Sequence, residues 1–348
     1  MEARDRQDMF AATDAGNKAA ERLLLADLLA SNSREEIELL LAKKQQREGE
    51  CNARYLRAEL ACFHAYPAES GWEELLMECC NVGHKEALFV AAIYHDWAGH
   101  AQAAEALVQR INDPSTNVAE SDVVWRDGWS AWSLPEWQVV ADTNGVRISR
   151  SSRFASNWLI GFLRTMLGPQ LRPAEVIDPE SGQTTAHPVR INRVAQWLPE
   201  QLGWIGKLFE CRLAAAAGYD VSNGEVLSLL HYQPGQRYKP HLDCLGIKQS
   251  QSDAGKEEGG QRTTTLLFAM GNDDYTGGET HFPKLDVSVK GATGELVRFN
   301  NTDDELQPLR ESLHEGVPVE SGEKWLLSKW VRERSTPYGR EINLRCND

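Results

Sequence analysis

One twelve-residue stretch limits what this chain can be more than any other part of the sequence. It reads Tyr232-Gln-Pro-Gly-Gln-Arg-Tyr-Lys-Pro-His-Leu-Asp243 and contains the only His-x-Asp of the chain. Side chains at positions i and i+2 of an extended segment point to the same face, so His241 and Asp243 can converge on one ion. His314, in a later run, is the candidate third ligand. The sequence therefore predicts a metal site.

The ligand types indicate a kind of chemistry. Two imidazoles and one carboxylate leave half of an octahedral coordination sphere open, which is the arrangement of non-heme Fe(II) oxygenases. The chain also contains one His-x-Glu, His84 with Glu86, in a segment with helical periodicity. On a helix these positions diverge by roughly 200°, so they cannot share an ion. We expect His84 to be a packing or surface residue.

Composition restricts the partners and the compartment. The chain has 348 residues, 41% hydrophobic content and a net charge of −14. Negative charge argues against nucleic acid and anionic membranes, both of which reward positive surface. The seven cysteines have no C-x-x-C spacing, so we expect reduced thiols and not a disulfide framework. Neither a signal peptide nor 18 consecutive apolar residues is found, and we expect a cytoplasmic protein.

The N-terminal part has the periodicity of helices. Ser33 with Glu36, and Ser70 with Glu73, match the capping box that starts a helix. The run 83–107 resembles one unit of a tetratricopeptide-like repeat. An ordinary helical bundle and a protein-docking surface both remain open as interpretations of this pattern.

Turn-forming residues without periodicity occupy positions 112–122 and predict a domain boundary. We therefore expect an α-helical domain over residues 1–118 and a second domain over residues 119–348. Four tryptophans follow the boundary, and packing between domains explains them better than a ligand platform: Trp125, Trp129, Trp132 and Trp137.

The second domain begins with mixed signals and becomes strand-rich. Asn144-Gly145 between apolar runs predicts a hairpin, and helices are expected over 158–167 and 198–217. From 225 onward, short strands punctuated by Gly, Pro, Asn and Asp favour a double-sheet jelly roll with its core at about 225–335. The run 246–261 has the composition of a flexible flap or of a loop of no consequence. The predicted fold class is α+β.

Several separated pieces of this domain occur together in one known family. They are 232–243 with its His-x-Asp, Arg262-Thr-Thr-Thr265-Leu-Leu, Gly277-Gly-Glu-Thr280-His-Phe-Pro283, Gly294-Glu-Leu-Val-Arg-Phe299, and His314-Glu-Gly-Val-Pro through Gly322-Glu-Lys324-Trp to Trp330. In this order they resemble the prolyl 4-hydroxylase-like branch of the Fe(II)/2-oxoglutarate dioxygenases. The resemblance covers roughly residues 145–335 and implies a C-terminal double-stranded β-helix.

The resemblance also implies roles for individual residues. His241, Asp243 and His314 would bind iron, and Lys324 would receive the distal carboxylate of 2-oxoglutarate. A buried lysine is costly unless paired, and this cosubstrate would supply the pair. The implied hydrogen-bonding partners of the cosubstrate are Tyr232 and Thr265. The implied residues of the substrate channel are Tyr238, Arg262 and Trp330.

Structural alternatives stay open for these last five residues. Tyr and Thr favour strands in any case, so Tyr232 and Thr265 can be plain strand residues. Tyr238 and Trp330 can be core aromatics, and Arg262 can belong to a surface ion pair.

The activity implied by the resemblance is hydroxylation of a C–H bond with Fe(II), 2-oxoglutarate and O2, releasing succinate and CO2, with ascorbate as reductant. A prolyl residue in a peptide or protein is the expected substrate, and a free amino acid or small metabolite is the alternative. From another class, a non-catalytic scaffold or sensor could keep the same fold.

Overall fold

The computed structural model describes residues 3–64, 66, 71–115, 133–177, 184–186, 190–271 and 274–342. It has two compact units. Unit 1 comprises Met1–Leu134, Pro199–Ala215 and Glu341–Asp348, and unit 2 comprises Pro135–Leu198 and Ala216–Arg340. In the described ranges, no helix combines the length and apolarity needed to cross a membrane.

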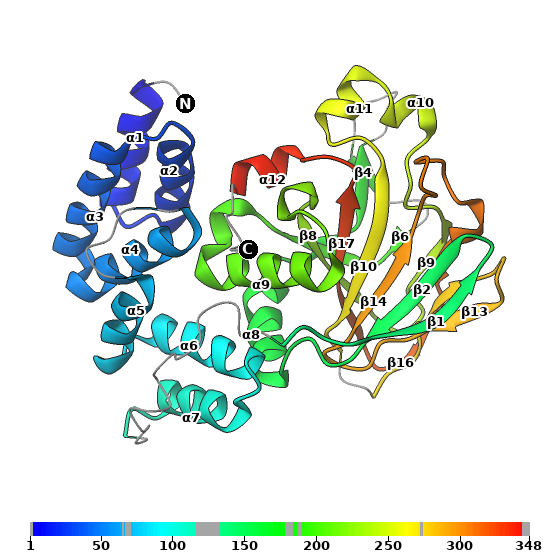
Figure 1. The fold of residues 1–348 in the computed structure, drawn as a ribbon, viewed down its shortest axis with the longest axis horizontal. Helices are drawn as coiled ribbons and strands as arrows, with labels where there is room; N and C mark the ends of the chain where they lie inside the picture. The colour runs from blue at the N-terminus through cyan, green and yellow to red at the C-terminus, as the bar shows by residue number, and fades with distance from the viewer. Residues whose placement is uncertain are drawn as a thin grey trace. The chain divides into compact units, whose positions relative to one another are not determined.

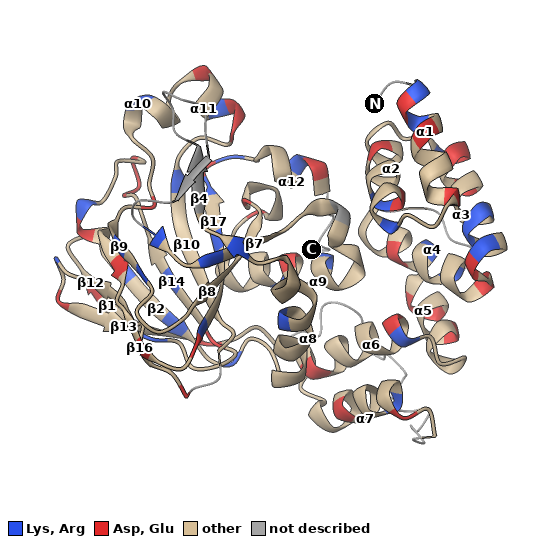
Figure 2. Ribbon diagram, turned by 180° about the vertical axis from the view of Figure 1, so that it is seen from behind, with Lys and Arg blue, Asp and Glu red and all other residues tan. Residues whose placement is uncertain are grey.

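Unit 1 is built from helices that pack in consecutive pairs (Figure 1). Its N-terminal helices are α1 (Ala3–Asp14), α2 (Lys18–Ala30), α3 (Arg34–Glu48), α4 (Glu50–His64), α5 (Trp72–Asn81), α6 (Lys85–Trp97) and α7 (Ala101–Asn112). Basic and acidic side chains are interspersed along them (Figure 2), as in the ion pair between Arg57 and Glu38. A tetratricopeptide-like arrangement stays a prediction.

The predicted helix starts near residues 33 and 71 are confirmed. Ser33 is the N-cap of α3, but its side chain makes no capping hydrogen bond to that helix. Its hydroxyl instead lies 2.9 Å from the Ser31 hydroxyl. Gly71 is the N-cap of α5, and Ser70 lies outside the described residues.

A later helix, α9 (Gly203–Ala217), supplies part of the core of unit 1. Its Trp204 lies 5.3 Å from the Tyr55 ring and 6.2 Å from the Phe63 ring, centroid to centroid. Unit 1 is therefore not one continuous stretch of sequence. The expected boundary near residue 118 stays a prediction, because residues 116–132 are not described and include Trp125, Trp129 and Trp132.

A buried carboxylate ties α9 to the N-terminal helices. Glu59 of α4 is fully buried and accepts two hydrogen bonds from Arg22 of α2, at 2.8 and 3.0 Å. The Lys207 ammonium of α9 lies 3.0 Å from the same carboxylate and 3.0 Å from Nε2 of His64. Burial alone would raise the pKa of Glu59, but Arg22 and Lys207 outweigh it and lower that pKa to about 2. Glu59 is thus ionised inside the unit.

The cysteines do not all follow the expectation of reduced thiols. Cys211 of α9 is disulfide-bonded, which corrects that expectation for this residue. Free thiols are found at Cys51, Cys62, Cys79, Cys80 and Cys244.

Unit 2 contains two large sheets whose neighbouring strands are all antiparallel. The eight-stranded sheet has the order β1 (Trp137–Thr143), β2 (Val146–Ser151), β14 (Leu296–Asn300), β10 (Arg262–Ala269), β17 (Lys324–Arg332), β8 (Leu227–Tyr232), β7 (Arg193–Trp197), β3 (Arg172–Pro173). The five-stranded sheet has the order β13 (Val287–Val289), β12 (Thr280–Phe282), β15 (His314–Gly316), β9 (Arg237–His241), β6 (Arg190–Ile191). Two-stranded sheets pair β4 (Glu175–Ile177) with β5 (Thr184–Ala186) and β11 (Thr276–Gly277) with β16 (Val319–Ser321).

The local predictions for unit 2 are largely confirmed. β1 and β2 form the hairpin around Asn144-Gly145, where both residues have the positive φ that a tight hairpin turn needs. The expected helix over 158–167 is α8 (Asn157–Leu167). Trp137 of β1 donates a hydrogen bond from its indole to the Ala216 carbonyl, at 2.8 Å.

The segment after Asp243 differs from its expectation. Residues 246–261 contain two short helices, α10 (Ile247–Ser250) and α11 (Asp253–Glu257), which the sequence pattern did not predict, and the role of the segment as a flap stays a prediction. The buried side chain of Gln261 accepts a hydrogen bond from the Leu245 amide at 2.6 Å and donates one to the Leu245 carbonyl at 2.8 Å. A Cβ on Gly255 would lie 1.9 Å from the Gln249 carbonyl, so the two helices pack as closely as a glycine allows.

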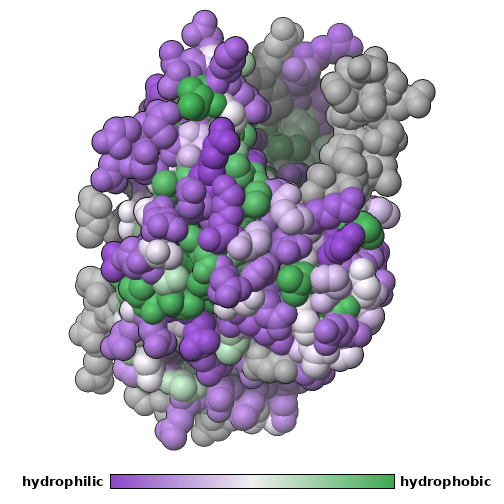
Figure 3. Space-filling view, turned by 90° about the vertical axis from the view of Figure 1, so that its right-hand side faces the viewer, coloured by the Kyte–Doolittle hydropathy of each residue, from purple (hydrophilic) through white to green (hydrophobic). Residues whose placement is uncertain are grey.

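The surface of unit 2 carries isolated apolar side chains. Val139 and Val140 of the edge strand β1 are exposed. In Figure 3 apolar side chains gather in a group left of centre, with hydrophilic side chains around it, and smaller apolar groups lie apart from it. Some exposed apolar surface is ordinary on folded proteins.

Candidate metal centre

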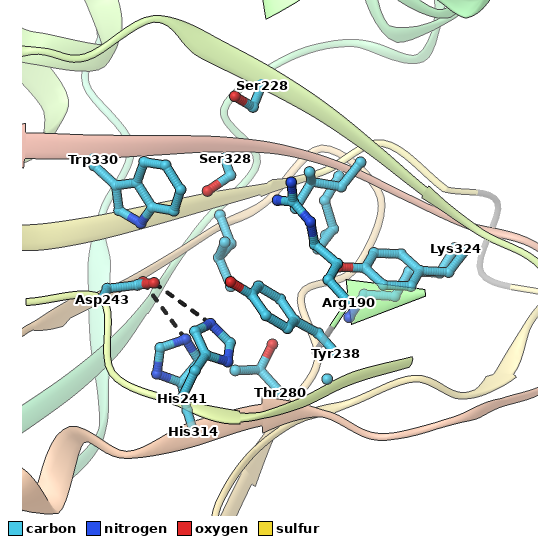
Figure 4. A pocket seen from close by; sticks show the side chains of 15 residues that line it. Arg190, Ser228, Tyr238, His241, Asp243, Thr280, His314, Lys324, Ser328 and Trp330 are labelled. Atoms are coloured by element: carbon cyan, nitrogen blue, oxygen red, sulfur yellow. Dashed lines mark ion pairs between the residues drawn. The ribbon is translucent and has the colours of Figure 1, made fainter. Parts of the chain in front are cut away.

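The five-stranded sheet brings the three predicted ligands together (Figure 4). His241 is the last residue of β9, Asp243 follows two residues later, and His314 begins β15, where it is the cross-strand partner of His241. Nε2 of His241 lies 3.5 Å from Oδ1 of Asp243, and Nε2 of His314 lies 3.5 Å from Oδ2. The three ligand atoms fall within 4.8 Å of one another.

Both imidazoles are oriented by backbone carbonyls. Nδ1 of His241 lies 2.8 Å from the Lys239 carbonyl, and Nδ1 of His314 lies 2.9 Å from the Ser312 carbonyl. A carbonyl only accepts, so each Nδ1 carries the hydrogen and each Nε2 keeps its lone pair toward Asp243. This is the tautomer that a metal-binding histidine with a carbonyl partner adopts. The donor set therefore fits a divalent metal ion.

The protonation states also suit a metal site. Burial alone would raise the pKa of Asp243, but His314, His241 and a hydrogen bond from Thr265 lower it below its ordinary range. Burial lowers the pKa of His314. A carboxylate and a neutral imidazole are the ligand forms that bind metal.

Aromatic rings hold the two histidines in place. The Tyr238 ring stacks on His241 with centroids 3.5 Å apart, and the Phe299 ring meets His314 at 4.7 Å in an edge arrangement. Phe282 contacts both Phe299 and His314 in the buried core of unit 2. The two histidines of the metal centre are therefore held by packed aromatic side chains.

The eight-stranded sheet contributes a buried cation to the same pocket. Lys324 is 4% exposed and is the cross-strand partner of Tyr232. Its ammonium donates a hydrogen bond to the Gly278 carbonyl at 2.6 Å and lies 5.3 Å from the Tyr232 ring centroid. Burial lowers the pKa of Lys324 to about 8. The position suits an anionic ligand that replaces the lost hydration of the ammonium.

The pocket between the ligands and Lys324 is lined by alternate residues of two strands. Its lining includes Ser228, Leu230 and Tyr232 of β8, and Lys324, Leu326, Ser328 and Trp330 of β17. Alternation puts these residues on one face of the sheet. The sequence predictions missed both serines, although a count of every second residue from Tyr232 and Lys324 finds them.

Arg190 is a charged lining residue to which the predictions assigned no role. It lies on β6, opposite Tyr238 of β9, and its guanidinium is 5.5 Å from the Tyr238 ring centroid. Thr280 and Gly316 also line the pocket.

The five residues predicted to contact the cosubstrate or the substrate divide into two groups. Tyr232, Tyr238 and Trp330 line the pocket as expected. Thr265 and Arg262 are not among the described lining residues. Thr265 donates its hydroxyl hydrogen to Asp243 Oδ2 at 2.7 Å. Contacts of these residues with a cosubstrate or substrate stay predictions.

Arg262 forms an ion pair, as the alternative interpretation predicts, but the pair is half-buried and not at the surface. It forms two hydrogen bonds with Glu225, at 2.6 and 2.8 Å, and its guanidinium stacks 3.6 Å from the Trp330 ring centroid. Arg262 therefore contacts the ring of a residue that lines the pocket without being among the described lining residues itself.

Two histidines and one carboxylate that converge beside a buried lysine have the donor arrangement of the non-heme iron oxygenases. Residues 227–332 match the model of the 2OG-Fe(II) oxygenase superfamily. In this region the chain is similar to the 2OG-Fe(II) oxygenases, and curated proteins that it resembles are prolyl 4-hydroxylases.

Known proteins extend this comparison. The chain is 32% identical over 199 residues to prolyl 4-hydroxylase subunit alpha-1 of Rattus norvegicus, covering 57% of this chain and 36% of that protein. It is 31% identical over 194 residues to prolyl 4-hydroxylase 1 of Arabidopsis thaliana, covering 50% of this chain and 65% of that protein. A solved structure, the 2OG complex of viral collagen prolyl hydroxylase from Paramecium Bursaria Chlorella virus-1, is 24% identical with a TM-score of 0.40, covering 53% of this chain and 95% of that one. The chain thus spans between about one third and two thirds of the length of the two curated relatives.

Proposed function

We propose that this protein is an Fe(II)- and 2-oxoglutarate-dependent dioxygenase that hydroxylates a prolyl residue in a peptide or protein. The observation that carries the proposal is the placement of His241, Asp243 and His314 across one pocket from Lys324. We further propose that the two large sheets of unit 2 form a double-stranded β-helix.

The residues of the pocket divide the work. His241, Asp243 and His314 would hold Fe(II), and Lys324 would bind the distal carboxylate of 2-oxoglutarate with Tyr232 beside it. When bound, iron and 2-oxoglutarate supply O2 activation and oxidative decarboxylation to succinate and CO2, with ascorbate as reductant. Leu230, Leu267 and Leu326 limit water in the pocket.

The prolyl assignment rests on the names of the relatives, which are prolyl 4-hydroxylases. A small-molecule substrate and a non-catalytic scaffold are the competing proposals. The scaffold is disfavoured because the three ligand atoms converge and the lysine is buried in the same pocket.

The decisive experiment measures succinate formed with Fe(II), 2-oxoglutarate, ascorbate and a library of proline-containing peptides. His241→Ala should abolish succinate formation. His281→Ala is the matched control, because His281 lies in the same sheet with its ring on the Ser288 hydroxyl, outside the ligand group. If His241→Ala forms as much succinate as the unmodified chain, this site does not take part in the reaction.

The substrate class is tested with the same enzyme. Mass spectrometry should show a gain of one oxygen on proline inside a peptide and none on free proline. The opposite result would favour the small-metabolite alternative. Absence of turnover, together with absence of Fe(II) binding, would favour the scaffold.

The helical unit is proposed to assist with protein substrates. A groove of unit 1 is lined by α3, α4 and α5, with Leu41, Ala53 and Leu75 among its apolar residues. Ala42→Lys, at an exposed position of this groove, should raise the Michaelis constant for a protein substrate and leave that for a short peptide unchanged. A cytoplasmic location is also part of the proposal.

A further inference from the structure

A chain of buried hydrogen bonds leads to the carboxylate of Asp243. Asn301 Nδ2 donates to the Thr265 hydroxyl at 2.9 Å, and that hydroxyl donates to Asp243 Oδ2 at 2.7 Å. Asn301 is 0% exposed, Thr265 is 1% exposed and Asp243 is 4% exposed. Water therefore does not compete for these bonds.

The direction of the chain is fixed by its chemistry. An amide nitrogen only donates, so the Thr265 oxygen is the acceptor for Asn301. The single hydroxyl hydrogen of Thr265 is then left for Asp243, which as a carboxylate only accepts. Asn301 thus decides which way the Thr265 hydroxyl points.

The backbones of the two supporting residues are hydrogen-bonded to neighbouring segments, whereas Asp243 follows the end of a strand. Thr265 is in the middle of β10, paired on one side with Phe299 of β14 and on the other with Trp330 of β17. The backbone N–H of Asn301 donates to the Thr263 carbonyl at 2.7 Å, and the backbone carbonyl of Asn301 accepts from the Leu309 N–H at 2.9 Å. Asp243 lies beyond the end of β9 and outside any strand.

We propose that Asn301 and Thr265 are positioning residues that hold the Asp243 carboxylate in the orientation required to bind the metal. This rests on the metal site of the proposed function and adds residues that do not touch the ion. Thr265 lies in the eight-stranded sheet and donates a hydrogen bond to Oδ2 of Asp243. Rotation of the carboxylate away from the two histidines would break this buried hydrogen bond. A buried carboxylate oxygen without its donor is costly, which gives the arrangement its stability.

The test uses Co(II) as a probe of the site in the absence of 2-oxoglutarate. Thr265→Val keeps the shape of the side chain and removes the hydroxyl, whereas Thr265→Ser keeps the hydroxyl. Thr264→Val makes the same change one residue away, where the side chain points to the other face of β10. We expect Thr265→Val to weaken Co(II) binding roughly 10- to 100-fold, the usual effect of losing a partner of a metal ligand. Thr265→Ser and Thr264→Val should bind Co(II) as the unmodified chain does.

Two further readouts separate positioning from other roles. The visible absorption of bound Co(II), which reports ligand number and geometry, should change in Thr265→Val and return in Thr265→Ser. At saturating Co(II), the affinity for 2-oxoglutarate should be the same in Thr265→Val and the unmodified chain. Normal Co(II) binding with weakened 2-oxoglutarate binding would overturn the inference and make Thr265 a cosubstrate contact.

The design distinguishes failure of the inference from failure of the proposed function. If the unmodified chain binds Co(II) and Thr265→Val binds it equally well, the positioning role is wrong and the enzyme assignment stands. If the unmodified chain binds no divalent metal, both are wrong. Circular dichroism checks folding, and Asn301→Ala gives an independent variant should Thr265→Val not fold, with weaker Co(II) binding again expected.

Discussion

His241 and His314 are cross-strand partners on β9 and β15, with ring centroids 4.4 Å apart. Antiparallel pairing places their side chains next to each other although the residues are far apart in sequence. A shift of the pairing by one residue would turn His314 to the other face of its strand. The metal centre therefore depends on the register of these two strands as much as on the identity of the ligands.

Lys324→Met should abolish tight binding of 2-oxoglutarate without lowering the stability of the cosubstrate-free protein. The ammonium is buried against a carbonyl, so its removal relieves a desolvation cost while it removes the charge that an anionic ligand needs. We expect a loss of at least about tenfold in affinity, measured by calorimetry with Co(II)-loaded protein. Lys284→Met, at an exposed position, is the control. A Met variant that binds 2-oxoglutarate normally would contradict the role of Lys324.

Affinity for 2-oxoglutarate should fall as the pH rises from 7 to 9. The pKa of Lys324 is lowered to about 8 by burial, so the ammonium loses its proton over this range before the ligand binds. The effect of pH on folding stability has the opposite sign. Between pH 8 and the ordinary lysine pKa, Lys324 holds fewer protons in the folded chain than in the unfolded chain. Its contribution to the free energy of unfolding therefore rises with pH over this range. Calorimetric titrations at several pH values measure the effect, and Lys324→Met should show no such decline.

Glu59→Gln should destabilise unit 1 strongly. It leaves Arg22 and Lys207 close together and buried without the carboxylate that both contact. Removal of one partner of a buried ion pair costs roughly 3–5 kcal/mol of unfolding free energy. Glu38→Gln removes a half-exposed partner of Arg57 and should cost less than about 1 kcal/mol. Chemical unfolding followed by circular dichroism compares the two, and equal effects would contradict the importance of the buried site.

Acid should gradually remove the contribution of the Glu59 carboxylate to the stability of unit 1. The pKa of Glu59 is about 2 in the folded protein, below its ordinary value, so its stabilising effect is complete above the ordinary value and is lost as the pH falls toward 2. The unfolding midpoint of the unmodified chain should therefore decline over this acidic range. The Glu59→Gln variant should decline less steeply, because it has no carboxylate to protonate at this position. Parallel acid titrations of both proteins make the comparison.

Local sequence patterns were enough for some parts of the site. The spacing of His241 and Asp243, the hairpin at Asn144-Gly145 and the strand alternation around Lys324 all depend on neighbouring residues. Such patterns determine which face of an element a side chain occupies.

Other parts depend on contacts between distant segments. Nothing near Thr265 in the sequence shows that its hydroxyl meets Asp243 and Asn301, because these three residues come from different elements. The pairing of Arg262 with Glu225 is equally distant. The helices in 246–261 escaped detection because polar short helices lack an apolar stripe, and the side chain that closes the segment, Gln261, lies at its end.

The buried position of the Glu59 carboxylate affects when unit 1 can finish folding during synthesis of the chain. Its partner Lys207 leaves the ribosome long after Arg22 and the rest of the N-terminal helices, because the first strands of unit 2 are translated in between. Domains ordinarily fold as units while synthesis proceeds. Until α9 is synthesised, the Glu59 carboxylate has Arg22 but not Lys207 as a partner. The Trp204 ring is also still absent from its place beside Tyr55 and Phe63. A fragment that stops at residue 115 lacks Lys207 and Trp204, so we expect it to be less stable than the complete unit 1, and point variants test substrate docking without this loss.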